Sequence, residues 1–217
     1  MADLMDLPKI PDNNIIVMDK SQVQRILEAV SDTSGMSEGE IIRHKKIIKR
    51  DYAIMMLFFG TGIRVSELVG IDISDIDFYN ASLFITRKGG DEDEVFFGSE
   101  VQEALEDYVS SDREILLAGK EDPALFISMQ HKLMTVRNVQ LMIKSYAKKA
   151  GLNMKVTPHA LRRTFGTNLY EETSDIYLVA DALHHSSVET TRKHYADMSK
   201  DHKRIAAQKS STLFKKD

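Results

Sequence analysis

The stretch TGIRVSEL, residues 61–68, lies where the hydrophobic pattern of the chain changes its period. Before it, apolar residues recur at helical spacing over residues 40–59, which predicts one long helix ended by a pair of glycines. After a short helical piece at residues 65–69, three short segments alternate or run apolar: IDISDIDF, SLFITRK and EVFFG. We expect them to form a small antiparallel sheet of about three strands.

The rest of the pattern is helical. Helix starts are indicated by Ser21-x-x-Gln24, by Ser99-x-x-Gln102 and by Thr157-Pro158. Further helices are expected near residues 135–150, 158–170 and 175–183 and after residue 187, whereas ALFISM at 124–129 is ambiguous between a strand and irregular structure. The sequence therefore predicts a mainly α fold with one small antiparallel β-sheet.

Composition limits the class of protein. A chain of 217 residues buries one substantial core, and the absence of cysteine excludes disulfides and thiolate metal sites. No apolar run approaches the roughly 18 residues of a membrane span, and the acidic start does not resemble a signal peptide. We expect a soluble cytoplasmic protein without a membrane partner, with a lead-in or linker at residues 1–18 and one domain at 19–217.

Charge is unevenly distributed. The net charge of −4 argues mildly against a nucleic-acid binder, but residues 66–122 hold 16 Asp/Glu against 4 Lys/Arg. The basic residues lie elsewhere, including the run RHKKIIKR at 43–50. This run fits either a solvated helix face or a DNA contact. In the second interpretation Arg43, Lys45 and Lys46 contact the DNA backbone.

Four segments contain candidate chemistry: TGIRVSEL at 61–68, RKGG at 87–90, HALRRTFGTNLY at 159–170 and LHHSSVETTRKHYA at 183–196. Each alone has a plain structural explanation. Arg64 after a glycine turn fits a helix cap, for example. His159 and Arg162 are three residues apart and share a helix face, which suits either phosphate binding or a simple surface pair.

Taken together, the order and spacing of these segments resemble the tyrosine recombinases, the family of phage integrases, transposon integrases and Xer-type recombinases. The resemblance covers roughly residues 20–200. The matched positions are Arg64 in TGxRxSEL, Lys88 in a β-hairpin turn, His159 and Arg162 in HxLR, His185 in the LGH segment, and the nucleophilic Tyr195. The resemblance implies the catalytic-domain fold of DNA breaking-rejoining enzymes.

The resemblance implies site-specific DNA recombination or integration through a 3′-phosphotyrosyl intermediate at Tyr195. Attack on a phosphodiester places negative charge on its non-bridging oxygens. Arg64 and Arg162 can bind these oxygens bidentately and stabilise that charge. We therefore expect neither a metal nor another cofactor.

The other matched residues have supporting roles in the resemblance. Lys88 protonates the departing 5′ oxygen, His159 accepts or relays the tyrosine proton, and His185 donates a hydrogen bond to the phosphate. Glu67 orients an arginine or is a surface carboxylate. Further contacts to the DNA backbone are expected from Arg163, Arg192 and Lys193, for which solvated positions are the alternative.

The sequence departs from the family pattern in one segment. Leu183-His184-His185 replaces the usual Leu-Gly-His, which leaves a choice between two histidines. We prefer His185 because SSVETT follows it, and interpret His184 as a cap or surface residue. Tyr170 and Tyr177 compete with the proposed nucleophile, but their helical spacing favours packing in the core.

Partners are also implied by the resemblance. The expected partner is double-stranded DNA, bound by a homotetramer in the synaptic complex and by a protein that is monomeric without DNA. The DNA-clamping N-terminal domain of the family is not recognisable, so we interpret the chain as truncated, with a natural minimal form as the alternative. The competing functions are a type IB topoisomerase-like activity, a catalytically silent DNA-binding module of the same fold, and a helical interaction protein in which these motifs occur by chance.

Overall fold

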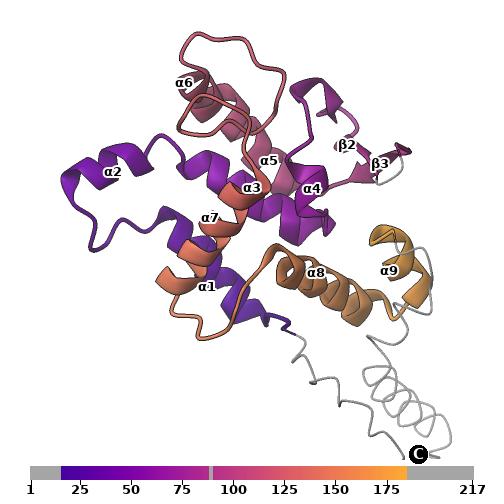
Figure 1. The fold of residues 1–217 in the computed structure, drawn as a ribbon. Helices are drawn as coiled ribbons and strands as arrows, with labels where there is room; N and C mark the ends of the chain where they lie inside the picture. The colour runs from indigo at the N-terminus through magenta and orange to yellow at the C-terminus, as the bar shows by residue number, and fades with distance from the viewer. Residues whose placement is uncertain (1–15, 88–89, 185–217) are drawn as a thin grey trace, which may run out of the picture.

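The computed structural model describes residues 16–87 and 90–184. Within these ranges the fold is mainly helical with one three-stranded antiparallel sheet of order β1-β2-β3, which confirms the predicted class (Figure 1). The helices are α1 (Lys20–Ser31), α2 (Glu38–His44), α3 (Ile48–Thr61), α4 (Val65–Leu68), α5 (Ser99–Asp107), α6 (Arg113–Leu117), α7 (Val136–Lys149), α8 (Pro158–Thr173) and α9 (Ile176–Ala182). The strands are β1 (Ile76–Asp77), β2 (Ser82–Thr86) and β3 (Glu92–Phe96). A 3₁₀ turn (Ile73–Asp75) precedes β1, and a π-helical segment (Tyr108–Asp112) joins α5 to α6.

Helix α3 forms the centre of the core and packs against α1, α5 and α8. Its apolar residues are buried around most of its circumference, as expected for a helix enclosed by others. The prediction of one helix over residues 40–59 is wrong, because α2 and α3 are separate. Asp112 accepts a hydrogen bond from the backbone nitrogen of Lys49 at 2.9 Å. This distant side chain caps the first turn of α3, so α3 begins as a separate helix.

The observed cap of helix α1, Asp19, lies two residues before the predicted cap, Ser21. Asp19 accepts a hydrogen bond from the Gln22 backbone at 2.9 Å, and the Gln22 side chain accepts one from the Asp19 backbone at 3.1 Å. This is a capping box of the expected type at a different pair of residues. Met18, at the end of the expected lead-in, is buried and donates its backbone hydrogen bond to Thr164 in α8.

The sheet packs one face on the core. In β2, Leu83 and Ile85 are buried while Phe84 between them is exposed, which is the alternation of a half-buried strand. Strand β1 is shorter than predicted because its first residues form the 3₁₀ turn. The ambiguous segment 124–129 is largely buried and makes isolated bridges rather than a regular strand.

Helices α8 and α9 carry a second, smaller apolar cluster that includes Tyr170. The predicted Thr157 cap is present, since its hydroxyl accepts from the Ala160 backbone at 3.2 Å. The core assignment of Tyr177 is wrong: its side chain is 71% exposed. Helix α9 has a single buried face around Val179, and Tyr177 lies on another face. Within residues 16–87 and 90–184, no helix is both long and apolar enough to cross a membrane.

Candidate active site

The turn after α3 sets the position of Arg64. Gly62 ends α3 with a φ of +63°, a left-handed conformation that favours glycine. A Cβ at this position would also collide with the ring of Phe165. The chain then enters α4, with Arg64 as the residue that precedes the helix.

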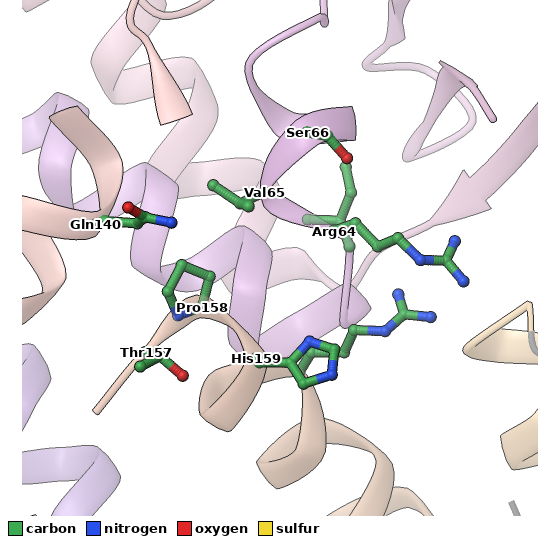
Figure 2. Close-up of a pocket in the computed structure, with 9 residues that line it drawn as sticks. Arg64, Val65, Ser66, Gln140, Thr157, Pro158 and His159 are labelled. Carbon is green, nitrogen blue, oxygen red and sulfur yellow. The ribbon is translucent and has the colours of Figure 1, made fainter. Parts of the chain in front are cut away.

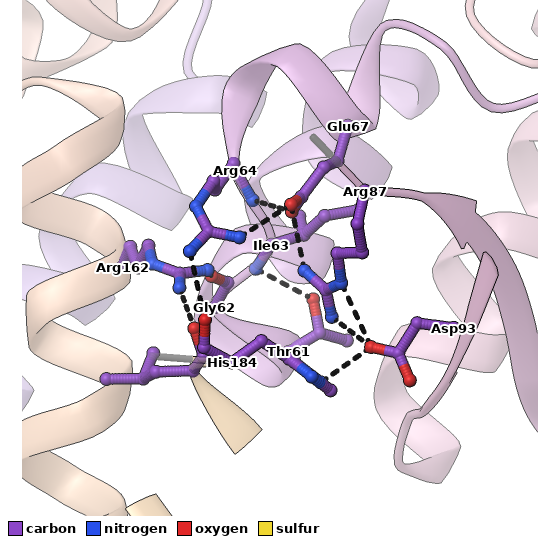
Figure 3. Close-up of polar contacts among 10 residues, drawn as sticks. Thr61, Gly62, Ile63, Arg64, Glu67, Arg87, Asp93, Arg162 and His184 are labelled. Carbon is purple, nitrogen blue, oxygen red and sulfur yellow. Dashed lines mark hydrogen bonds and ion pairs between the residues drawn. The ribbon is translucent and has the colours of Figure 1, made fainter. Parts of the chain in front are cut away.

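Arg162 lies next to Arg64 although it comes from a segment 100 residues beyond Gly62. It is only 4% exposed and donates hydrogen bonds to the carbonyl oxygens of Gly62, at 2.5 Å, and of Leu183. Arg64 donates to the next carbonyl along, that of His184, at 3.2 Å. Consecutive carbonyls at the end of α9 therefore hold both guanidinium groups, as Figure 3 shows.

Glu67 fixes Arg64 from the other side. Its carboxylate accepts hydrogen bonds from the Arg64 backbone nitrogen and the Arg64 guanidinium, both at 2.8 Å. Its side chain is 4% exposed, so the alternative of a surface carboxylate is wrong. Burial by itself raises the pKa of Glu67, but hydrogen bonds from Arg64 and Arg87 outweigh it and lower the pKa below its usual value. Glu67 is therefore an ionised, buried acceptor.

A third guanidinium completes the cluster. Arg87, at the end of β2, donates to Glu67 at 2.8 Å and to Asp93 at 2.5 and 2.9 Å. The cluster thus combines three guanidinium groups with two carboxylates, which leaves one net positive charge for an anion. Arg87 and Asp93 were not among the site residues predicted from the sequence. The hairpin register, in which Asp93 pairs with Ile85, is the pattern that indicates their proximity.

A hollow of about 310 Å³ lies against the two arginines (Figure 2). It is lined by Ile63, Arg64, Val65, Ser66, Gln140, Thr157, Pro158, His159 and Arg162. His159 is exposed in the first turn of α8, as the cap at Thr157 predicted. A cavity lined by Arg64, Arg162 and the first turn of α8 suits a phosphate-sized anion.

Five of the predicted residues lie outside the described part of the chain: Lys88, His185, Arg192, Lys193 and Tyr195. The structure places the remaining DNA-contact candidates, and none of them lines the hollow. Arg163 is half-buried in α8, and Arg43, Lys45 and Lys46 are exposed at the end of α2. Figure 1 shows α2 and α9 on opposite sides of the molecule.

Arg50, the last residue of the basic run at 43–50, forms hydrogen bonds inside the core. Arg50 is 5% exposed and donates to Asp51 at 2.6 and 2.8 Å and to the carbonyl of Ile127 at 2.9 Å. Its charge is therefore satisfied within the core. Among the residues that the structure describes, no group of three or more His, Asp or Glu side chains forms a metal site.

Comparison with known proteins identifies the class. The model of the phage integrase family matches residues 17–202, and the chain therefore belongs to this family. The tyrosine recombinase XerC of Oceanobacillus iheyensis is 36% identical over 164 residues, which cover 75% of this chain and 53% of that protein. The tyrosine recombinase XerD of Corynebacterium glutamicum is 36% identical over 143 residues, 66% of this chain and 47% of that protein. The chain spans about half the length of these relatives.

Solved structures agree with the family assignment. The crystal structure of XerA recombinase has a TM-score of 0.69 and 28% identity, covering 86% of this chain and 65% of that one. The Tn1549 transposon integrase in complex with transposon right-end DNA has a TM-score of 0.74 at 21% identity, covering 96% of this chain and 70% of that one. The second likeness establishes the shared fold alone. The predicted resemblance and fold are confirmed.

Proposed function

We propose that the chain is the catalytic part of a site-specific recombinase that cleaves and rejoins DNA through a covalent bond to Tyr195. The observation that supports this most directly is the pairing of Arg64 with Arg162 on consecutive carbonyls. Two ordered guanidinium groups beside a hollow are suited to hold two non-bridging oxygens of one phosphodiester. Relatives named as tyrosine recombinases support the same activity.

In the proposed reaction the Tyr195 oxygen forms a bond to phosphorus while the bond from phosphorus to the 5′ oxygen breaks. His159 takes the tyrosine proton, Lys88 gives a proton to the departing 5′ oxygen, and His185 donates a hydrogen bond to the phosphate. The charge that develops on the non-bridging oxygens is stabilised by the two arginines, because their positions are set before the reaction. Attack by a 5′ hydroxyl of the partner strand reverses these transfers and needs no ATP.

Double-stranded DNA is the proposed partner, with four protomers joined in the synaptic complex. The Tn1549 integrase structure contains transposon DNA, and the XerH recombinase structure contains its difH substrate. We propose that Arg163, Arg192 and Lys193 contact the DNA backbone near the cleavage site. Arg43, Lys45 and Lys46 would then contact a different part of the DNA, because α2 lies far from α9. Such contacts to phosphates predict binding that weakens steeply with salt.

Covalent trapping tests the proposed function. The substrate is a nicked suicide duplex built from the DNA that flanks the gene encoding the chain, and the longest form of the protein is tested alongside. We expect a denaturation-resistant adduct whose mass-mapped attachment site is Tyr195, and no adduct from Tyr195→Phe despite unchanged duplex binding. Arg64→Ala and Arg162→Ala should each slow adduct formation by about 10²-fold or more. Measurable DNA binding without any adduct would instead identify a catalytically silent module.

A further inference from the structure

His184 occupies the position at which the family pattern has a glycine. Its φ is +44°, a region that non-glycine residues rarely adopt and that glycine adopts without cost. A histidine here therefore carries a conformational penalty. The side chain, however, makes a contact that a glycine cannot make.

The imidazole of His184 connects the end of α9 to the β2–β3 hairpin. Its Nε2 lies 2.8 Å from Oδ2 of Asp93, and the two side chains are 31% and 27% exposed. Since a carboxylate accepts hydrogen bonds, Nε2 is the donor. Burial, and after it the charge of Arg87, lower the pKa of His184 against the opposing effect of the nearby carboxylates Asp93, Asp181 and Glu67. The contact is therefore a hydrogen bond in which Nε2 of His184 donates to the Asp93 carboxylate.

This contact closes a ring of hydrogen bonds around Arg64 (Figure 3). Asp93 also accepts from Arg87, and Arg87 donates to Glu67. Glu67 accepts from Arg64, and Arg64 donates to the backbone carbonyl of His184. His184 thus makes two contacts in this ring. Its carbonyl accepts from Arg64, and its imidazole donates to Asp93 of the hairpin.

We propose that His184 is a positioning residue that holds the guanidinium of Arg64 in its phosphate-binding orientation by joining α9 to the hairpin through Asp93. This inference rests on the proposed function of Arg64. Arg162 is held by burial, whereas the Arg64 side chain is 39% exposed and depends on its hydrogen bonds for its orientation. Without the imidazole, the His184 carbonyl can move relative to the Glu67 carboxylate. These two groups accept the hydrogen bonds of Arg64, so the guanidinium then loses its fixed orientation.

Two substitutions remove the His184 imidazole but keep the backbone conformation at this position. His184→Gly suits the positive φ, and His184→Asn also tolerates it while ending well short of Asp93. Both should leave the melting temperature close to that of the wild type, and both should slow adduct formation on the suicide duplex by about 10–100-fold, the scale of a misplaced catalytic group. The matched control is Ser82→Ala, which removes a 2.7 Å hydrogen bond to Glu94 in the same hairpin, outside the ring. The control should cleave at the wild-type rate.

A second readout needs no DNA. The Nη–H signals of Arg64, assigned by their loss in Arg64→Lys, are followed by ¹⁵N NMR of the 217-residue chain, because the Nη nitrogens donate to Glu67 and to the His184 carbonyl. In the wild type these protons should exchange slowly with water, and in His184→Gly and His184→Asn they should exchange faster or broaden. The Nη–H signals of Arg162 should stay unchanged, because the hydrogen bonds of these nitrogens do not pass through the imidazole.

A double-mutant cycle, measured by cleavage, tests whether His184 acts through Arg64. If His184 acts through Arg64, His184→Gly should have almost no further effect on cleavage in an Arg64→Lys background. An equal loss in both backgrounds, or an unaltered Arg64 signal in His184→Gly, would overturn the positioning role while leaving the recombinase proposal standing. Absence of any adduct from the wild type, together with an altered Arg64 signal, would overturn the proposed function but retain the hydrogen-bond ring.

Discussion

Replacement of Glu67 by glutamine tests the electrostatics of the arginine cluster. The substitution keeps the size of the side chain but removes the charge that faces Arg64 and Arg87, each at 2.8 Å. Removing one partner of a buried ion pair costs about 3–5 kcal/mol. Because the Arg64 side chain is 39% exposed and can be hydrated again, we expect a loss of unfolding free energy at the lower end of this range, about 3 kcal/mol.

The expected effect is measurable by thermal unfolding near neutral pH. For a chain of this size each kcal/mol shifts the melting temperature by about 2–4 °C, so Glu67→Gln should melt roughly 6–12 °C below the wild type. The matched control is Asp107→Asn, which removes an exposed ion pair with Lys49 at 3.8 Å. Such pairs contribute about 0–1 kcal/mol, so its shift should stay within about 4 °C. Equal melting temperatures for the two variants would refute the assignment of Glu67 as a buried charged acceptor.

Three further predictions concern stability. The pKa of Glu67 is lowered in the folded state, so its contribution is fully present above an unfolded pKa of about 4.3 and is lost as pH falls through the folded pKa. The gap in melting temperature between wild type and Glu67→Gln should narrow as pH is lowered from 6 to about 3, and a constant gap would contradict this. Gly62→Ala should cost roughly 2–5 kcal/mol in urea unfolding, from the positive φ and the collision with Phe165; a loss below about 1 kcal/mol would count against this strain. Tyr146→Phe should cost about 2 kcal/mol in the same assay, because Asp51 loses a buried hydrogen bond of 2.6 Å, and an unchanged midpoint would show that this bond is dispensable.

Several features of the site were predictable from local sequence alone. The Thr157 cap fixes where α8 begins, and so places His159 in its first turn and Arg162 on the same face. The glycine turn at Gly62 likewise predicts that Arg64 follows a helix end. These features depend on residues only a few positions apart, and capping and turn chemistry act over that distance.

Other features required the tertiary structure. The break between α2 and α3 depends on Asp112, which is distant in sequence and supplies the cap that local periodicity could not indicate. The exposed position of Tyr177 depends on which face of α9 packs against α8. The wrong predictions of a single helix over 40–59 and of a core position for Tyr177 have one cause. Periodicity shows that a helix has an apolar face, but not which neighbour covers that face or where a distant side chain ends the helix.

The sequence by itself determined the family, the mainly helical class with its small sheet, and the residue types that can bind a phosphate. Only the tertiary structure decided how these residues are held. Arg64 and Arg162 meet because α9 returns to the turn after α3 and offers two consecutive carbonyls, and Glu67 is buried because Arg87 reaches it from the hairpin. The physical reason is that caps and turns depend on neighbouring residues, whereas buried charge is stabilised by partners that only the folded chain brings together.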